Sequence, residues 1–160
     1  MLRPETGRMM LDTATGPTEG KEPDVADAVV DLHTRTVDAL AGFEKMVEKA
    51  EPEFREVVER FRELHARHAV ALKVILADLG VKVDDDGSFM GTVNEAVVSL
   101  RAFFDEIDED TMDNIRSGEE HVLRAFDAAI AGGLPQPHET SIVEMRAELR
   151  DLLDATKHID

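Results

Sequence analysis

The feature of this chain that most restricts its fold is the spacing of its apolar side chains, which recur every three or four residues over long stretches. That spacing lines one side of an α-helix. In the first stretch, about Val25 to Ala50, the recurring residues are Val29, Leu32, Thr36, Leu40, Phe43 and Val47. No stretch shows the strict alternation of apolar and polar residues that is typical of strands. The sequence therefore predicts an all-α protein.

Three further stretches repeat the helical pattern, at about residues 52–79, 112–131 and 138–159. Pro52 stands where the first turn of a helix tolerates proline, and Gly80 is a predicted C-terminal stop. Thr111 is a predicted N-cap for the third stretch, which Gly132 and Gly133 close. The connection from residue 50 to 52 is so short that the first two helices must run antiparallel.

The pattern predicts one domain with four long helices. A shorter helix is expected near residues 93–107, inside the connection between the second and third long helices. This is the layout of an up-down four-helix bundle with one crossover connection, as in ferritin-like folds. Residues 1–24 hold three of the ten Gly and show no sustained periodicity, which predicts a flexible N-terminal tail. The bundle domain is then residues 25–160.

Charge and composition exclude several classes of function. The formal net charge is −17, so the chain lacks the clustered Lys and Arg that neutralise nucleic-acid phosphates or bind an anionic membrane surface. The absence of cysteine removes disulfides, thiolate metal sites and cysteine nucleophiles. No apolar run approaches the roughly 20 residues that span a bilayer, and the N-terminus lacks the apolar segment of a secretory signal. We expect a cytoplasmic protein without nucleic-acid or membrane partners.

A few polar side chains fall on or beside the inward faces of the predicted helices, where burial costs free energy. His65 and His68 share one face of the second helix, and Glu119 lies on the inward stripe of the third long helix. Glu44 in the first helix and Glu148 in the last could join them. Imidazole and carboxylate groups suit Fe, Mn and Zn, so one interpretation of these five residues is an incomplete metal site.

Two other interpretations of the histidine pair stay open. His65 and His68 could be neutral buried residues whose ring nitrogens contact Glu44, Glu119 or water and thereby fix the helix register. Alternatively, they could form a pH sensor, because protonating two adjacent histidines inside a bundle would loosen it. Three further histidines are expected to be exposed: His33, His138 and His158.

Other positions bear on how the helices pack. Gly42 and Gly118 lie in the middle of predicted helices, where each costs about 1 kcal/mol relative to Ala, so either a close helix approach compensates or the cost is tolerated. Four apolar residues outside the inward stripes are expected to widen the apolar faces and to pack against a second copy. They are Val70, Val74, Val98 and Leu123.

Several short motifs occur in a fixed order along the chain. They are Gly42-Phe43, Leu79-Gly80, Gly87-Ser88 with Gly91, Gly118-Glu119-Glu120, Phe126 with Ala129, and Leu134-Pro135. From roughly Ala28 to Ile159, this order resembles an uncharacterised bacterial ferritin-like four-helix-bundle family, a domain of unknown function. The resemblance implies the bundle fold and no established activity.

The chain also departs from the pattern of that family. Phe43 and Phe126 stand where the family often has Tyr, and Met145 and Leu153 stand where Gln and His are expected. The resemblance is therefore that of a divergent member.

Two functions from different classes follow from the sequence. No nucleophile elbow or phosphate-binding loop is present, so we favour a non-catalytic bundle without a cofactor. It would act through its surface, as a homo-oligomer such as a dimer or as a stress-related binding module whose protein partner is unknown. The alternative is a redox or metal-storage protein that binds Fe, Mn or Zn at the incomplete site formed by Glu44, His65, His68, Glu119 and Glu148.

Overall fold

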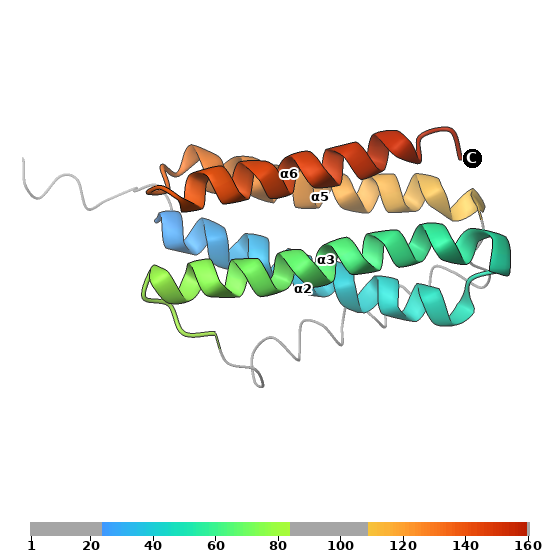
Figure 1. Ribbon diagram of the computed structural model, residues 1–160, viewed down its shortest axis with the longest axis horizontal. Helices are drawn as coiled ribbons and strands as arrows, with labels where there is room; N and C mark the ends of the chain where they lie inside the picture. Colours follow the sequence, from blue (N-terminus) through green and yellow to red (C-terminus); the bar gives the residue numbers. More distant parts are fainter. Residues whose placement is uncertain (1–23, 84–108, 160) are drawn as a thin grey trace, which may run out of the picture.

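The computed structural model describes residues 24–83 and 109–159 (Figure 1). Within them lie four α-helices and one short 3₁₀ turn: α2 (Val25–Lys49), α3 (Pro52–Asp78), η2 (Glu109–Thr111), α5 (Met112–Ala131) and α6 (His138–Ala155). These two ranges contain no strand, so the all-α prediction is confirmed for them. The predicted tail before Asp24 and the predicted helix at residues 93–107 lie outside the described residues.

The predicted ends of the first three long helices agree with the structure. Pro52 is the first residue of α3, and Gly80 follows that helix with a φ of 84°, a left-handed conformation that glycine adopts without a steric penalty. The C-terminal end of α5 is also as predicted, with Gly132 as its C-cap and Gly133 at a φ of 80°. Thr111 occupies the N-cap position of α5, but its side chain makes no capping hydrogen bond.

The last helix is shorter than the sequence pattern predicts, since α6 ends at Ala155 rather than Ile159. The side chain of Arg116, on α5, reaches this end and donates hydrogen bonds to the carbonyl oxygens of Thr156 at 3.0 Å and Ile159 at 2.6 Å. A cation that binds terminal carbonyl groups compensates for the hydrogen bonds that a helix loses where it stops. Thr156 lies in the turn after α6 and is still buried there. The spacing of inward residues in the sequence therefore extends past the end of the helix.

The four helices lie side by side along a common direction (Figure 1). α2 packs against α3 and α5, and α6 packs against α5 and α3. α3 and α5 are therefore opposite each other across the diagonal of the group. The colours in Figure 1 show that α3 and α5 run in the same direction, while α2 and α6 run in the other. α3 ends at the left of the view, whereas α5 begins at the right.

The core is aliphatic with a few aromatic rings, as the composition requires. Among its fully buried side chains are Phe61, Phe126, Leu32, Leu72, Leu76 and Leu149. Two residues expected outside the inward stripes are buried as well: His33 is 5% exposed and Leu123 is 2% exposed. The exposed position predicted for His33 and the outward position predicted for Leu123 are wrong. α2 and α5 each contact two neighbouring helices, so their buried faces are wider than one stripe.

The glycine in the middle of α5 is tolerated rather than required. A Cβ atom built on Gly118 meets nothing within 4 Å, and the residue is exposed, so no close helix approach depends on it. Gly80 also has open space, but its positive φ strains any residue with a side chain.

We therefore expect Gly118→Ala to stabilise the protein by about 1 kcal/mol, because alanine has the higher helix propensity. Urea unfolding followed by circular dichroism measures the change. Gly80→Ala is the matched control and should destabilise by about 1 kcal/mol. A loss of stability in Gly118→Ala would contradict the open environment described for this position.

Candidate functional site

A buried hydrogen bond joins the two helices that face each other across the diagonal. The Nε2 atom of His65 on α3 lies 2.7 Å from Oε1 of Glu119 on α5, with both side chains no more than 2% exposed. A ring nitrogen can donate to a carboxylate, which only accepts, so the geometry places a proton on Nε2 of His65. Each residue sits on the inward stripe of its helix, as the sequence predicts.

Aromatic rings seal this pair from the sides. Phe43 of α2 stacks on the His65 ring, with centroids 5.5 Å apart and planes at 13°. Phe43 also stacks on Phe61 of α3, with centroids 5.2 Å apart. Next to it, His68 meets His65 edge-on at 6.5 Å and meets Phe126 edge-on at 6.0 Å. The polar groups are thus embedded in a largely apolar layer, where hydrogen bonds are strong and unpaired groups are costly.

His68 faces a different carboxylate. Its Nε2 atom lies 3.6 Å from Oε1 of Glu148 on α6, beyond ordinary hydrogen-bond distance, while Oε2 of Glu148 accepts a hydrogen bond from Arg67 at 2.9 Å. The side chain of His68 is 2% exposed, and that of Glu148 is 43% exposed. Glu148 therefore stands between the buried layer and the solvent.

Burial decides the charge of His68. It lowers the pKa of His68 to about 4, because the effect of desolvation exceeds the opposing attraction of Glu148, and the charges of His65 and Arg67 add to the lowering. For Glu148, partial burial acts to raise the pKa, but the hydrogen bond and charge of Arg67 together with His68 hold it below its ordinary value. His68 is therefore a neutral ring beside an ionised carboxylate at neutral pH.

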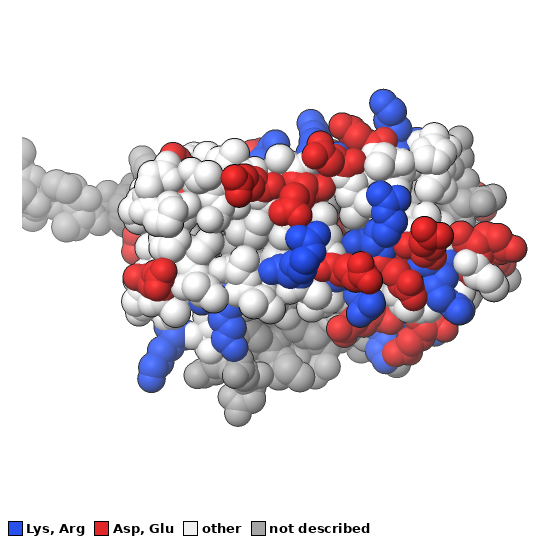
Figure 2. All heavy atoms as spheres, in the orientation of Figure 1, with Lys and Arg blue, Asp and Glu red and all other residues white. Residues whose placement is uncertain are grey.

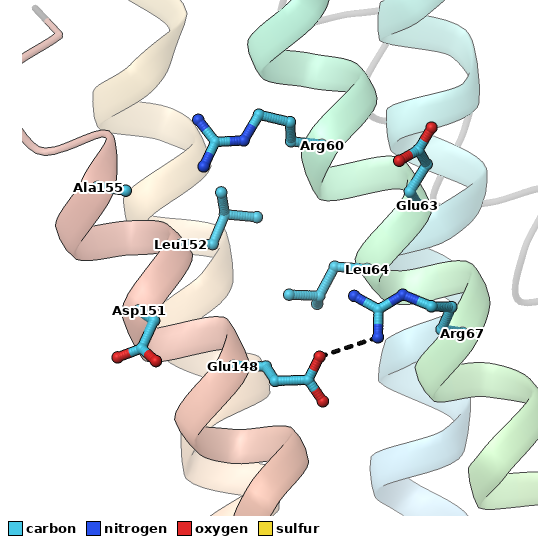
Figure 3. A pocket seen from close by; sticks show the side chains of 8 residues that line it. All are labelled: Arg60, Glu63, Leu64, Arg67, Glu148, Asp151, Leu152 and Ala155. Carbon is cyan, nitrogen blue, oxygen red and sulfur yellow. Dashed lines mark hydrogen bonds and ion pairs between the residues drawn. The ribbon is translucent and has the colours of Figure 1, made fainter.

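Glu148 also lines a groove of about 480 Å³ between α3 and α6 (Figure 3). The Arg67–Glu148 ion pair crosses the groove, and Arg60 extends from α3 toward α6 beside it. Three further charged residues on its walls make no ion pair with any residue in the described ranges: Arg60, Glu63 and Asp151. Leu64 and Leu152 form its apolar floor, so the groove has charged walls of both signs.

The five predicted site residues do not come together as one cluster. His65 pairs with Glu119, and His68 faces Glu148, which are two separate contacts. Glu44 is exposed, because one step along α2 from the buried Phe43 turns its side chain toward solvent. The expectation that Glu44 could reach the histidines is therefore wrong.

Sequence reasoning missed Arg67, which holds Glu148 in place. A contact between residues 81 positions apart leaves no periodic signal, so nothing in the sequence could have indicated it. The exposed position expected for His138 also differs from the structure, because its ring is only 16% exposed and lies 3.3 Å from Asp78.

The predicted metal-binding residues, as they lie in the structure, do not form a site that fits a metal ion. In residues 24–83 and 109–159, no group of three or more His, Asp and Glu side chains could hold a metal ion. Some buried polar atoms of the layer nonetheless lack hydrogen-bond partners in those ranges: Nδ1 of His65, both ring nitrogens of His68 and Oε2 of Glu119. In general, a buried polar atom without a partner costs about 1–3 kcal/mol.

No described helix has both the length and the apolar character required to cross a membrane. A model of the family described as a domain of unknown function (DUF2383) matches residues 24–132. No curated protein and no solved structure matches the chain.

The buried pair can be tested by a double-mutant cycle. We expect Glu119→Met and His65→Leu each to cost about 3 kcal/mol, since each leaves the other polar group buried and unpaired. The double variant should cost about 2 kcal/mol less than the sum, which urea unfolding measures. Glu120→Met, at an exposed neighbouring position, is the control and should change stability by under about 0.5 kcal/mol. Strict additivity would show that the two side chains do not interact.

Stability should also depend on pH through His68. Its folded pKa of about 4 lies below the ordinary value, so the unfolded chain binds more protons between these values. As far as His68 is concerned, the free energy of unfolding is then highest above a pH of about 6.5. It falls by about 3 kcal/mol as the pH drops to about 4. His68→Gln should lose less over this window than the natural protein, while the exposed His158→Gln should not differ. Equal losses in all three proteins would be the contrary result.

Proposed function

Since the chain belongs to the DUF2383 family, a domain of unknown function, we propose that it is a non-catalytic helical protein of the cytoplasm that acts by binding through its surface. In this proposal it works as an oligomer or as a stress-related binding module. The buried histidines and carboxylates hold the helices in register and perform no chemistry.

One observation carries the proposal. The polar groups of the core are arranged as two separate contacts, His65 with Glu119 and His68 with Glu148, rather than around a common point. A catalytic or metal centre requires several groups aimed at one reacting atom or ion. A buried hydrogen bond between two helices instead specifies how those helices align, because any shift along the axis would leave both groups unpaired.

A ferritin-like topology is part of the proposal. α3 and α5 lie diagonally and run in the same direction, so the end of α3 and the start of α5 are at opposite ends of the group (Figure 1). One long connection distinguishes ferritin-like bundles from those joined only by short loops. The antiparallel pairs α2–α3 and α5–α6 also match that arrangement.

Metal binding is the second candidate, and the unpaired buried atoms favour it. Imidazole nitrogens of His65 and His68 and the free oxygen of Glu119 are the donor types that bind Fe, Mn or Zn. Glu148 would be a further donor on the solvent side. In this alternative, the protein stores a divalent metal ion or uses it in redox chemistry.

Metal content and thermal unfolding distinguish the two candidates. For protein purified without chelator, we expect less than about 0.1 metal ion per chain, and a melting temperature that changes by under about 1 °C with excess Zn²⁺, Mn²⁺ or Fe²⁺. A ligand that binds the folded state at about 100 times its Kd adds about 2.7 kcal/mol of stability, which would raise the melting temperature by several degrees.

A metal-dependent rise in melting temperature would favour the second candidate if it disappears in Glu119→Gln. Glu120→Gln provides the matched control, because its side chain is exposed one position away on the same helix. A rise that both variants retain would reflect binding to the acidic surface and would leave the first proposal in place.

A further inference from the structure

An apolar stripe runs along the outer side of α3, opposite the face that packs into the core. Val70 is 68% exposed and Val74 is 58% exposed, the two highest values among large apolar side chains in the described ranges. Ala66 and Ala77 continue the row, one turn before and one turn after the valines. α3 thus carries apolar residues on two sides, and the other described helices cover only one of them.

Charged residues border this stripe, since Arg67 and Lys73 lie one turn before and after Val70 and Asp78 lies one turn after Val74. Figure 2 shows Lys, Arg, Asp and Glu side chains gathered over the right-hand part of the visible face and sparse over the left-hand part. The C-terminal half of α3 and the N-terminal half of α6 lie on the left in the same orientation (Figure 1). On a chain with a net charge of −17, two exposed valines one turn apart on a single helix face mark a candidate contact surface.

A hollow of about 370 Å³ lies at the C-terminal end of the stripe. Its lining combines apolar residues with two lysines: Lys73, Ala77, Gly80, Val81, Lys82 and Val83. The hollow is therefore positively charged on an otherwise acidic protein, so it suits a carboxylate at the tip of an approaching side chain.

The stripe is complementary to itself when two copies of α3 meet antiparallel. With Val70 opposite the other copy's Val74, the alanines of each helix lie at the ends of the contact, where small side chains let two helices approach closely. The same register carries Glu63, which makes no ion pair with a residue in the described ranges, toward the end of the other stripe, where Lys82 lines the hollow.

We propose that the outer face of α3 from Glu63 onward, together with Lys82 in the segment after the helix, is the surface on which a second copy of this chain docks antiparallel. The proposal rests on the proposed function, in which the protein acts through its surface, and names the partner. Val70 and Val74 form the apolar centre, and the pair Glu63–Lys82 fixes the direction. A contact of a few helical turns is small, so the dimer dissociates in the range of about 1 to 100 μM.

The net charge of each copy gives the dimer a characteristic salt dependence. Two chains of charge −17 repel each other, while the apolar contact does not depend on ionic strength. We therefore expect dimerisation to strengthen as salt rises from about 0.05 to about 0.5 M, where the Debye length falls to a few ångströms.

Sedimentation equilibrium of the full chain over about 1 to 500 μM tests the surface. The Val70→Glu and Val74→Glu double variant should weaken dimerisation at least about tenfold, since it places carboxylates in the centre of the contact. Val143→Glu is the matched control. Val143 is 45% exposed on α6, three residues from Arg146, which pairs with Asp127 on α5, so it lies away from the stripe.

Charge reversal tests the direction of docking. Glu63→Lys and Lys82→Glu should each weaken the dimer, and their combination in one chain should restore it, because both two-fold-related contacts are then reversed together. The chain has no cysteine, so single substitutions provide a second test. Mixed chains with Val70→Cys and Val74→Cys should form a disulfide more readily than either variant alone.

A chain that stays monomeric at about 500 μM in high salt would overturn the inference. So would a dimer that Val143→Glu disrupts and the double valine variant does not, or faster disulfide formation within Val70→Cys alone, which would indicate a parallel contact. Circular dichroism confirms that each variant remains folded. A chain that stays monomeric would overturn both this inference and the oligomeric form of the proposed function, whereas a dimer that uses another surface would overturn this inference alone.

Discussion

The arrangement of the four helices depends on one buried contact, the hydrogen bond from Nε2 of His65 to Oε1 of Glu119. It spans the diagonal of the group and joins α3 to α5, two helices whose main neighbours are α2 and α6. Apolar side chains alone tolerate small shifts along a helix axis. A buried donor and acceptor do not, because any shift that separates them leaves both groups without water or a partner.

The residues around this bond extend its effect. Phe43 stacks on His65, so the position of α2 is tied to the same ring. His68, one turn later on α3, contacts Phe126 of α5 and faces Glu148 of α6. One layer therefore touches all four helices. Its polar groups are used in contacts between helices.

The sequence specified the helices well, because their cause is local. The three- and four-residue spacing, Pro52 at the start of α3 and Gly80 after its end act over a few residues, and the structure agrees with each. The inward positions of His65, His68 and Glu119 could also be predicted, since they lie on stripes that must be buried.

The rest depends on contacts between distant parts of the chain. Which carboxylate meets which histidine is set by how the helices pair, so Glu148 with Arg67 could not be foreseen. Glu44 was expected to be able to join the histidines, but it lies one step along α2 from the buried Phe43, and a single step along a helix rotates the side chain by about 100°. His33 and Leu123 are buried because α2 and α5 each pack against two neighbouring helices. The width of a buried face depends on these neighbours, so the sequence of one helix does not predict it.

The most direct test of the central contact is nitrogen-detected NMR of the histidine rings in protein labelled with ¹⁵N. We expect the His65 Nε2 atom to carry a proton that exchanges slowly with water, and its signal to stay unchanged when Zn²⁺ is added. A bare Nε2 atom at neutral pH, or ring signals that move with zinc, would show that this histidine serves as a metal ligand rather than as the link between α3 and α5.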